Sequence, residues 1–196
     1  MPRGLARDHD DKRRAIRRGA ARYFADQGYA KASMAGAARA CGTSKALLYH
    51  YYASKEALLH DILLAHLTEL ARVVEDVPDD APEIRFRALV AAILGAYRDA
   101  DAEHRLQIDA LETLPPEMQA PLRALQRQLV AAMEAAIAAL RPDLAGGRRL
   151  KPAAMSVFAM LNWFFLWHRP GRDIPREDYA AMVADLVLGG LPAVAA

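Results

Sequence analysis

The chain contains a single cysteine, Cys41, among its 196 residues. One cysteine cannot form an intramolecular disulfide, which excludes the small disulfide-stapled folds. Because Cys41 lies on an apolar stripe of a predicted helix, we expect a buried small hydrophobic residue rather than a redox sensor. The fold must therefore be stabilised by an ordinary hydrophobic core.

Long hydrophobic runs are also missing. The longest apolar stretch, Ala153 to Trp167, contains Ser156 and Asn162 and is shorter than the ~20 residues of a membrane-spanning helix. The first residues are basic but lack the apolar centre of a signal peptide. We expect a soluble, cytoplasmic protein without a membrane partner.

No catalytic pattern stands out in the sequence. Gly-x-Ser-x-Gly, a phosphate-binding glycine loop, Cys-x-x-Cys and His-Glu-x-x-His are all absent. His104, three residues after Asp101, is a weak metal candidate, and a surface ion pair explains it better. We therefore predict that the protein is not an enzyme and has no metal site and no cofactor.

Alanine and leucine dominate the chain, β-branched residues are few, and no strand-like alternation persists. This composition predicts an all-α protein of about nine helices, preceded by a flexible segment up to about Asp10. Pro and Gly clusters divide the later helices. Outside the segment 33–53, which holds two short helices, the predicted helices are 11–27, 55–75, 83–100, 102–113, 117–140, 152–168 and 175–188.

The charge is small overall but unevenly distributed. The formal net charge is +2, whereas residues 1–58 carry twelve Lys and Arg against five Asp and Glu, or +7, which leaves −5 for the rest. A basic N-terminal part joined to an acidic remainder is typical of a nucleic-acid-binding domain attached to a regulatory one.

The segment 33–53 has the pattern of two short helices joined by a turn. Ser33 and Ser44 are suited to cap the two helices, and Gly42 is suited to end the first. Four residues at helical spacing form one apolar stripe of the first helix: Met34, Ala37, Ala38 and Cys41. The pattern indicates a helix-turn-helix motif.

The second helix of this motif presents residues that suit a DNA backbone. Leu48 and Tyr52 share one face, so the other faces carry Lys45, Ala46, Tyr49 and His50. No acidic residue occurs from Ala40 to Ser54. Lys55 follows Ser54, which is expected to cap the next helix, and a cation is favourable there only if an anion such as a phosphate docks nearby.

Residues from about Lys12 to Leu59 resemble the DNA-binding domain of TetR-family transcriptional repressors. The resemblance rests on these residues: Ala20, Ala21, Phe24, Gly28, Tyr29, Ser33, Met34, Ala38, Gly42, Ser44, Lys45, Leu48 to Tyr51, and Ser54 to Leu59. The departures are Ala37, Thr43 and Tyr52, together with Leu47, which is bulkier than the residue often found there. The pattern covers the first third of the chain and is highly specific.

The resemblance implies a role for each matching residue. Lys45, Ala46 and Leu47 would meet base edges, with Ser44 beside them at the helix start. Tyr49, His50 and Lys55 would contact phosphates, and Ser33 would anchor the first helix to the backbone. It also implies a DNA-binding domain at 11–58, with the motif at 33–53, and a regulatory and dimerisation domain at 59–192.

The last two helices are expected to form a homodimer. The helix at 152–168 is apolar almost all round and needs burial on every side, and the helix from Pro175 carries a broad apolar stripe. Two such helices from each chain would make a four-helix interface, as in TetR-like proteins. A twofold dimer would read an inverted-repeat operator.

The body is expected to bind a small-molecule inducer, as TetR-like proteins do. Asn162 is a polar amide in an apolar helix, so it needs a partner across the dimer or in a ligand. The run from Asn162 to Gly171 resembles regulators of fatty-acid, steroid and aromatic-acid breakdown, several of which respond to acyl-CoA thioesters. The candidate ligand-binding residues are Phe86, Ile93, Tyr97, Met133, Asn162 and Trp163, and Arg98, Arg105 and Arg123 are candidates to meet CoA phosphates.

The sequence thus predicts a DNA-binding transcriptional regulator, a homodimeric repressor released from a palindromic operator by an inducer and nucleoid-associated when bound. One alternative is a protein of the same fold whose body binds a protein partner. Another is an all-helical enzyme with a vestigial DNA-binding domain, which would need a buried polar cluster.

Overall fold

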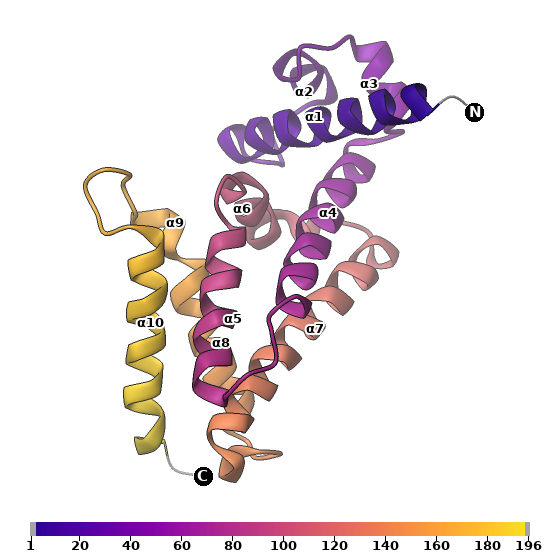
Figure 1. Ribbon diagram of the computed structural model, residues 1–196. Helices are drawn as coiled ribbons and strands as arrows, with labels where there is room; N and C mark the ends of the chain where they lie inside the picture. The colour runs from indigo at the N-terminus through magenta and orange to yellow at the C-terminus, as the bar shows by residue number, and fades with distance from the viewer. Residues whose placement is uncertain (1–2, 195–196) are drawn as a thin grey trace. The chain divides into compact units, whose positions relative to one another are not determined.

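The computed structural model describes residues 3–194, with side chains from residue 9 onward (Figure 1). All regular elements in this part of the chain are helical, which confirms the predicted all-α class. The α-helices are α1 (Arg3–Gln27), α2 (Met34–Ala40), α3 (Lys45–Tyr51), α4 (Lys55–Glu75), α5 (Pro82–Ala96), α6 (Asp101–Ala110), α7 (Pro116–Leu140), α8 (Leu150–Asn162), α9 (Phe164–Trp167) and α10 (Arg176–Gly190). Three single 3-10 turns occur at Leu111–Thr113, Pro142–Leu144 and Leu191–Ala193.

Each predicted helical stretch has a counterpart, with two differences. The stretch 152–168 is divided at Trp163 into α8 and the single turn of α9. The expected flexible start was wrong for residues 3–10, which are the first turns of α1. These residues contain no proline, so nothing in their sequence stops a helix.

The chain divides into two compact units, 1–66 with 100–122, and 67–99 with 123–196. The predicted domain boundary after residue 58 falls inside α4, a single helix that contributes residues to both units. The assignment of separate domains at 11–58 and 59–192 therefore stays a prediction.

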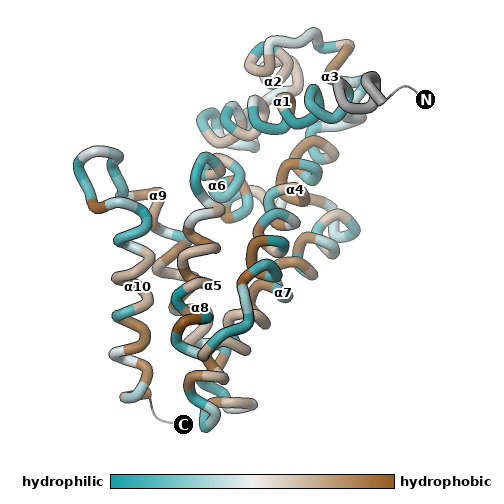
Figure 2. The backbone as a smooth tube through the Cα atoms, in the orientation of Figure 1, coloured by the Kyte–Doolittle hydropathy of each residue, from teal (hydrophilic) through white to brown (hydrophobic). Residues whose placement is uncertain are grey.

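In the first unit, α1 packs against α2 and α6, and α2 packs against α3. Most of the coloured part of α1 consists of hydrophilic residues (Figure 2). Its buried side includes Ile16, Ala20 and Phe24, at the helical spacing that the sequence predicts. Leu48 of α3 and Leu58 of α4 are also fully buried, so one apolar core holds the small helices in place.

In the second unit, α10 runs alongside α5 and also contacts α8 (Figure 1). The buried side of α5 includes Phe86, Val90 and Leu94, and Val183 on α10 is also fully buried. Arg87 of α5 forms an ion pair with Asp185 of α10 at 2.6 Å. Both side chains of that pair are substantially exposed, so packing rather than charge holds the two helices together.

The stretch Leu150–Trp167 within the described residues has the length and hydropathy of a membrane span, and 28% of it is buried. Its helix is interrupted at Trp163. Length and composition alone are weak support for a span.

Candidate nucleic-acid interface

The segment 33–52 folds as a helix-turn-helix motif. The Ser33 Oγ accepts a hydrogen bond from the Gly36 backbone N–H at 3.1 Å, and the Ser44 Oγ accepts one from the Leu47 N–H at 3.0 Å. Gly42 lies in the turn with a φ of 62°, a left-handed conformation that costs glycine little. Both predicted serine caps and the glycine turn are thus confirmed.

One face of α3 is open to solvent. Lys45, Ala46, Tyr49 and His50 are exposed, while Leu48 is fully buried on the opposite face. The Lys45 Nζ lies 5.7 Å from the centre of the Tyr49 ring, one helical turn further along. Leu47 is half-buried at the edge of this face. The exposed residues therefore offer a cation, a phenol and an imidazole on one short helix.

A glycine allows α1 and α2 to approach closely. A Cβ added at Gly36 would lie 1.9 Å from the Oη of Tyr23 on α1, which is far inside contact distance. The Tyr23 hydroxyl also accepts a hydrogen bond of 3.4 Å from the Ser33 backbone N–H. Tyr23 thus holds the start of α2, and only glycine fits beneath its ring.

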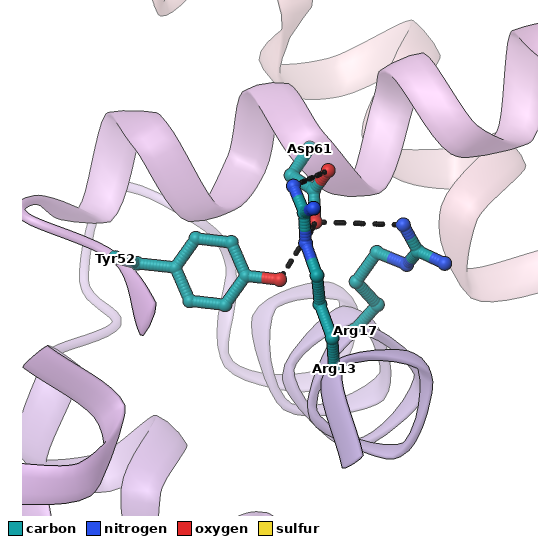
Figure 3. Close-up of polar contacts among 4 residues, drawn as sticks. All are labelled: Arg13, Arg17, Tyr52 and Asp61. Carbon is teal, nitrogen blue, oxygen red and sulfur yellow. Dashed lines mark hydrogen bonds and ion pairs between the residues drawn. The ribbon is translucent and has the colours of Figure 1, made fainter. Parts of the chain in front are cut away.

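A buried carboxylate connects α1, the end of α3 and α4 (Figure 3). Asp61 accepts hydrogen bonds from Arg13 at 2.7 Å and 3.1 Å and from the Tyr52 hydroxyl at 2.6 Å. The Nη1 of Arg17 lies 3.5 Å from the Oδ2 of the same carboxylate. Burial, together with the neighbouring Asp61 carboxylate, raises the pKa of the Tyr52 phenol, so Tyr52 stays protonated and keeps donating.

Lys55, at the start of α4, points toward the turn that precedes α2. Its Nζ donates to the backbone oxygens of Tyr29, Ala30 and Ala32 at 3.0, 3.5 and 3.1 Å. The same ammonium lies 4.4 Å from the centre of the Tyr29 ring. The Ser54 Oγ accepts from the Ala57 N–H at 3.1 Å, which confirms the predicted cap. The phosphate contact expected of Lys55 stays a prediction.

The surroundings of His104 and Cys41 can also be compared with the predicted ones. His104 is buried, with its ring 5.9 Å from that of His66, so the expected surface position was wrong. It is Arg105 that lies near Asp109, at 3.5 Å. Cys41 is half-buried rather than fully buried as predicted, and its thiol donates to the Ile16 carbonyl. Burial raises the pKa of this thiol, which disfavours the thiolate form.

The candidate ligand residues lie mostly inside the second unit. Phe86, Ile93, Tyr97 and Met133 are buried. The Tyr97 hydroxyl donates to the Asn162 Oδ1 at 2.9 Å, and burial raises the pKa of Tyr97, which keeps the phenol protonated. Asn162 is therefore paired within its own chain.

Trp163 is placed differently from the other candidates. It is 53% exposed and lies at the break between α8 and α9. Of the candidates for CoA phosphates, Arg98 forms an ion pair with Glu177 of α10.

The two parts of the chain match two family profiles. Residues 16–62 match the bacterial regulatory proteins of the tetR family, and residues 79–191 match the tetracyclin repressor-like C-terminal domain. The chain belongs to the TetR family of transcriptional regulators, whose helix-turn-helix domain binds DNA. No curated protein sequence matches it.

Several solved structures are similar over nearly the whole chain. A TetR-family regulator from Bordetella parapertussis is 34% identical, with 94% of this chain and 97% of that one covered and a TM-score of 0.85. PfmR from Thermus thermophilus is 28% identical, covering 90% and 98%, with a TM-score of 0.79. AibR, crystallised with isovaleryl coenzyme A and operator DNA, is 27% identical, covering 89% and 97%, with a TM-score of 0.76.

Proposed function

We propose that the protein is a homodimeric repressor that binds an inverted-repeat operator and is released by a small-molecule inducer. The observation that carries the proposal is the exposed, acid-free face of α3 on a serine-capped helix-turn-helix motif. A protein that acts on chromosomal DNA works in the cytoplasm, associated with the nucleoid while bound.

The proposed DNA contacts divide into base-reading and phosphate-binding groups. Lys45 is exposed at the first turn of α3 and can donate to guanine, while Ala46 and Leu47 can touch a thymine methyl. Because the Ser33 and Ser44 oxygens accept backbone N–H groups, their hydroxyl hydrogens remain available to phosphate oxygens. Tyr49 and His50 complete the proposed phosphate contacts, while the Lys55 ammonium is held by three backbone carbonyls.

The dimer is proposed to form through α8, α9 and α10. Large apolar side chains on these helices are exposed in the single chain: Met155, Trp163, Leu166, Trp167, Met182 and Leu186. Isolated exposed apolar residues are common, but a group of this size on neighbouring helices marks an interaction surface. A second copy with the same surface would bury it across a twofold axis.

Sedimentation equilibrium tests the dimer directly. Leu186 is 60% exposed, and Leu186→Arg would place a charge in the proposed interface, so we expect a monomer that binds operator at least tenfold more weakly. Ile84→Arg is the matched control, since Ile84 is 55% exposed on α5 and lies outside the proposed surface. A Leu186→Arg protein that sediments as a dimer would place the interface elsewhere.

The inducer is proposed to enter among the buried residues of the second unit. Phe86, Ile93 and Met133 provide apolar contact, and the Tyr97–Asn162 pair provides the polar groups that fix a ligand's orientation. Trp163 belongs to the proposed set through its position next to Asn162. An inducer that reaches Asn162 would exchange the Tyr97 hydrogen bond for one of its own.

An acyl-CoA or related hydrophobic metabolite is the proposed inducer class. The support is the chain's 27% identity over most of its length to AibR, which was crystallised with isovaleryl coenzyme A. Arg98, Arg105 and Arg123 are the proposed phosphate-binding cations. Because Arg98 pairs with Glu177, a CoA phosphate there would have to displace that carboxylate.

Release requires the inducer to prefer one arrangement of the protein over another. A ligand shifts such an equilibrium only by its differential affinity for the two states. Since α4 contributes residues to both compact units, we propose that a shift of α4 changes the spacing of the two α3 helices in the dimer.

Selection of random duplex DNA at about physiological salt tests the DNA-binding proposal. We expect an inverted repeat; binding without a motif would make the protein a non-specific DNA anchor. A panel of acyl-CoAs added to the resulting complex then tests the inducer. Release that is weakened in Tyr97→Phe supports the proposed site, and no release at concentrations far above micromolar would exclude the acyl-CoA class.

A further inference from the structure

The ammonium group of Lys55 is already engaged by the protein. A lysine ammonium has three N–H donors, and three backbone oxygens lie within 3.5 Å of the Lys55 Nζ, those of Tyr29, Ala30 and Ala32. The Tyr29 ring adds a cation–π contact at 4.4 Å. A phosphate could take one of these donors only if a carbonyl gave it up.

The three carbonyls belong to the turn between α1 and α2. Within this turn, the N–H groups of Lys31 and Ala32 donate back to the Gly28 carbonyl at 3.1 Å. The Tyr29 ring packs edge-on against Phe24, a fully buried residue of α1, with the ring centres 5.5 Å apart. The turn is therefore held from α1 on one side and by Lys55 on the other.

The residue that follows this turn is Ser33, the cap of α2. Its Oγ and backbone N–H are both used within the protein, by Gly36 and by Tyr23. The position of Ser33, and with it the start of α2, consequently depends on where the turn lies. Lys55 is the first residue of α4, and its side chain connects this turn to that helix.

We propose that Lys55 is a positioning residue for operator binding. It binds the carbonyls of the 29–32 turn and so holds Ser33 and the start of α2 at the place from which α3 meets DNA. Its charge serves the turn rather than a phosphate. The inference rests on the proposed DNA-binding function and assigns to Lys55 a role other than direct contact.

Two substitutions separate positioning from phosphate contact. Lys55→Met keeps the aliphatic stem and removes all three donors, so under positioning operator affinity falls about tenfold or more. The slope of log affinity against log salt stays unchanged, because no phosphate contact is lost. If Lys55 instead binds a phosphate, the slope falls by about 0.9.

Lys55→Arg distinguishes the two roles from the opposite direction. A guanidinium keeps the positive charge and binds phosphate well, but its planar fork cannot place donors among three converging carbonyls. We expect Lys55→Arg to remain as weak as Lys55→Met. Recovery of wild-type affinity in Lys55→Arg would overturn the proposal.

Hydrogen exchange of the DNA-free protein gives a readout independent of operator binding. Backbone amides from residue 29 to residue 36 should exchange about tenfold faster in Lys55→Met, because the turn loses its connection to α4. Lys31→Met is the matched control, since Lys31 is an exposed lysine of the same turn. Unchanged exchange in Lys55→Met would overturn the positioning role.

These measurements also separate this inference from the proposed function. If the wild-type protein selects no DNA motif, the repressor proposal fails, whereas the exchange experiment still reports whether Lys55 holds the turn. If the wild type binds an inverted repeat and Lys55→Met lowers the salt slope without faster exchange, Lys55 is a phosphate contact and the inference fails alone.

Discussion

The Tyr52 hydroxyl lies 2.6 Å from a carboxylate oxygen of Asp61 and donates a hydrogen bond to it inside the DNA-binding part of the chain. Tyr52 is the residue that ends α3, and Asp61 lies in the second turn of α4. Arg13 and Arg17 of α1 form ion pairs with the same carboxylate. One acidic side chain thus positions the end of the recognition helix against two other helices (Figure 3).

Asp61→Asn should destabilise the protein by about 1–3 kcal/mol, because the amide cannot replace the charged acceptor of two arginines and a phenol. Urea unfolding followed by circular dichroism measures the change. Glu69→Gln is the matched control, since Glu69 pairs with Arg72 on the exposed side of α4 and should cost less than about 0.5 kcal/mol. Equal effects of the two substitutions would show that the Asp61 contacts contribute nothing beyond a surface pair.

Gly36→Ala should be costly although alanine is the better helix former. The added Cβ would lie 1.9 Å from the Tyr23 Oη, so Tyr23 must move and its hydrogen bond with the Ser33 N–H is lost. We expect a loss of about 1–3 kcal/mol in unfolding free energy and weaker operator binding.

Gly95→Ala is the control for Gly36→Ala, because a Cβ at Gly95 on α5 would meet no atom within 4 Å. There the usual helix preference applies, and the protein should become more stable by about 0.5–1 kcal/mol. A stabilising effect at both positions would mean that Tyr23 swings away without cost.

Lys45→Ala should weaken operator binding and also relax the preference for particular bases. Lys45 is exposed in the first turn of α3, from which a side chain reaches base edges in the major groove. Tyr49→Phe is the comparison: losing a phosphate contact should weaken all sequences equally. Selection of DNA from a randomised operator library measures both, and an unchanged motif for Lys45→Ala would mean that another residue reads the bases.

The helices and caps of the DNA-binding part could be predicted because their signals are local. Ser33, Gly42 and Ser44 act on backbone groups within four residues, so spacing alone identifies their roles. The extension of α1 to Arg3 was missed because the residues before Asp11 have no apolar periodicity that would predict a helix.

The contacts that position the motif could not be predicted, because they join residues far apart in the chain. Arg13 and Asp61 are 48 residues apart, and Lys55 bonds a turn 23 to 26 residues earlier. From the sequence alone, a lysine that follows a helix-capping serine is as consistent with a solvent-exposed cation as with one that binds a distant turn. Similarly, His104 resembled a surface residue beside Asp101, and only the packing of α6 shows that it is buried.

His66 should make the protein less stable in mild acid. Burial, together with the neighbouring His104, lowers the pKa of His66 from 6.5 to about 3, so the folded protein keeps this imidazole neutral. In the unfolded chain it is protonated below about pH 6.5, so the unfolded state binds more protons between pH 3 and 6.5. The unfolding free energy should therefore fall by about 2 kcal/mol from pH 7 to pH 5 on account of His66 alone.

His66→Gln isolates this contribution from that of the carboxylates, which titrate in both proteins. The variant cannot take a proton at position 66, so its unfolding free energy should fall by about 2 kcal/mol less than that of the wild type over the same pH range. Parallel curves for wild type and His66→Gln would show that His66 is protonated to the same extent in the folded and unfolded chains.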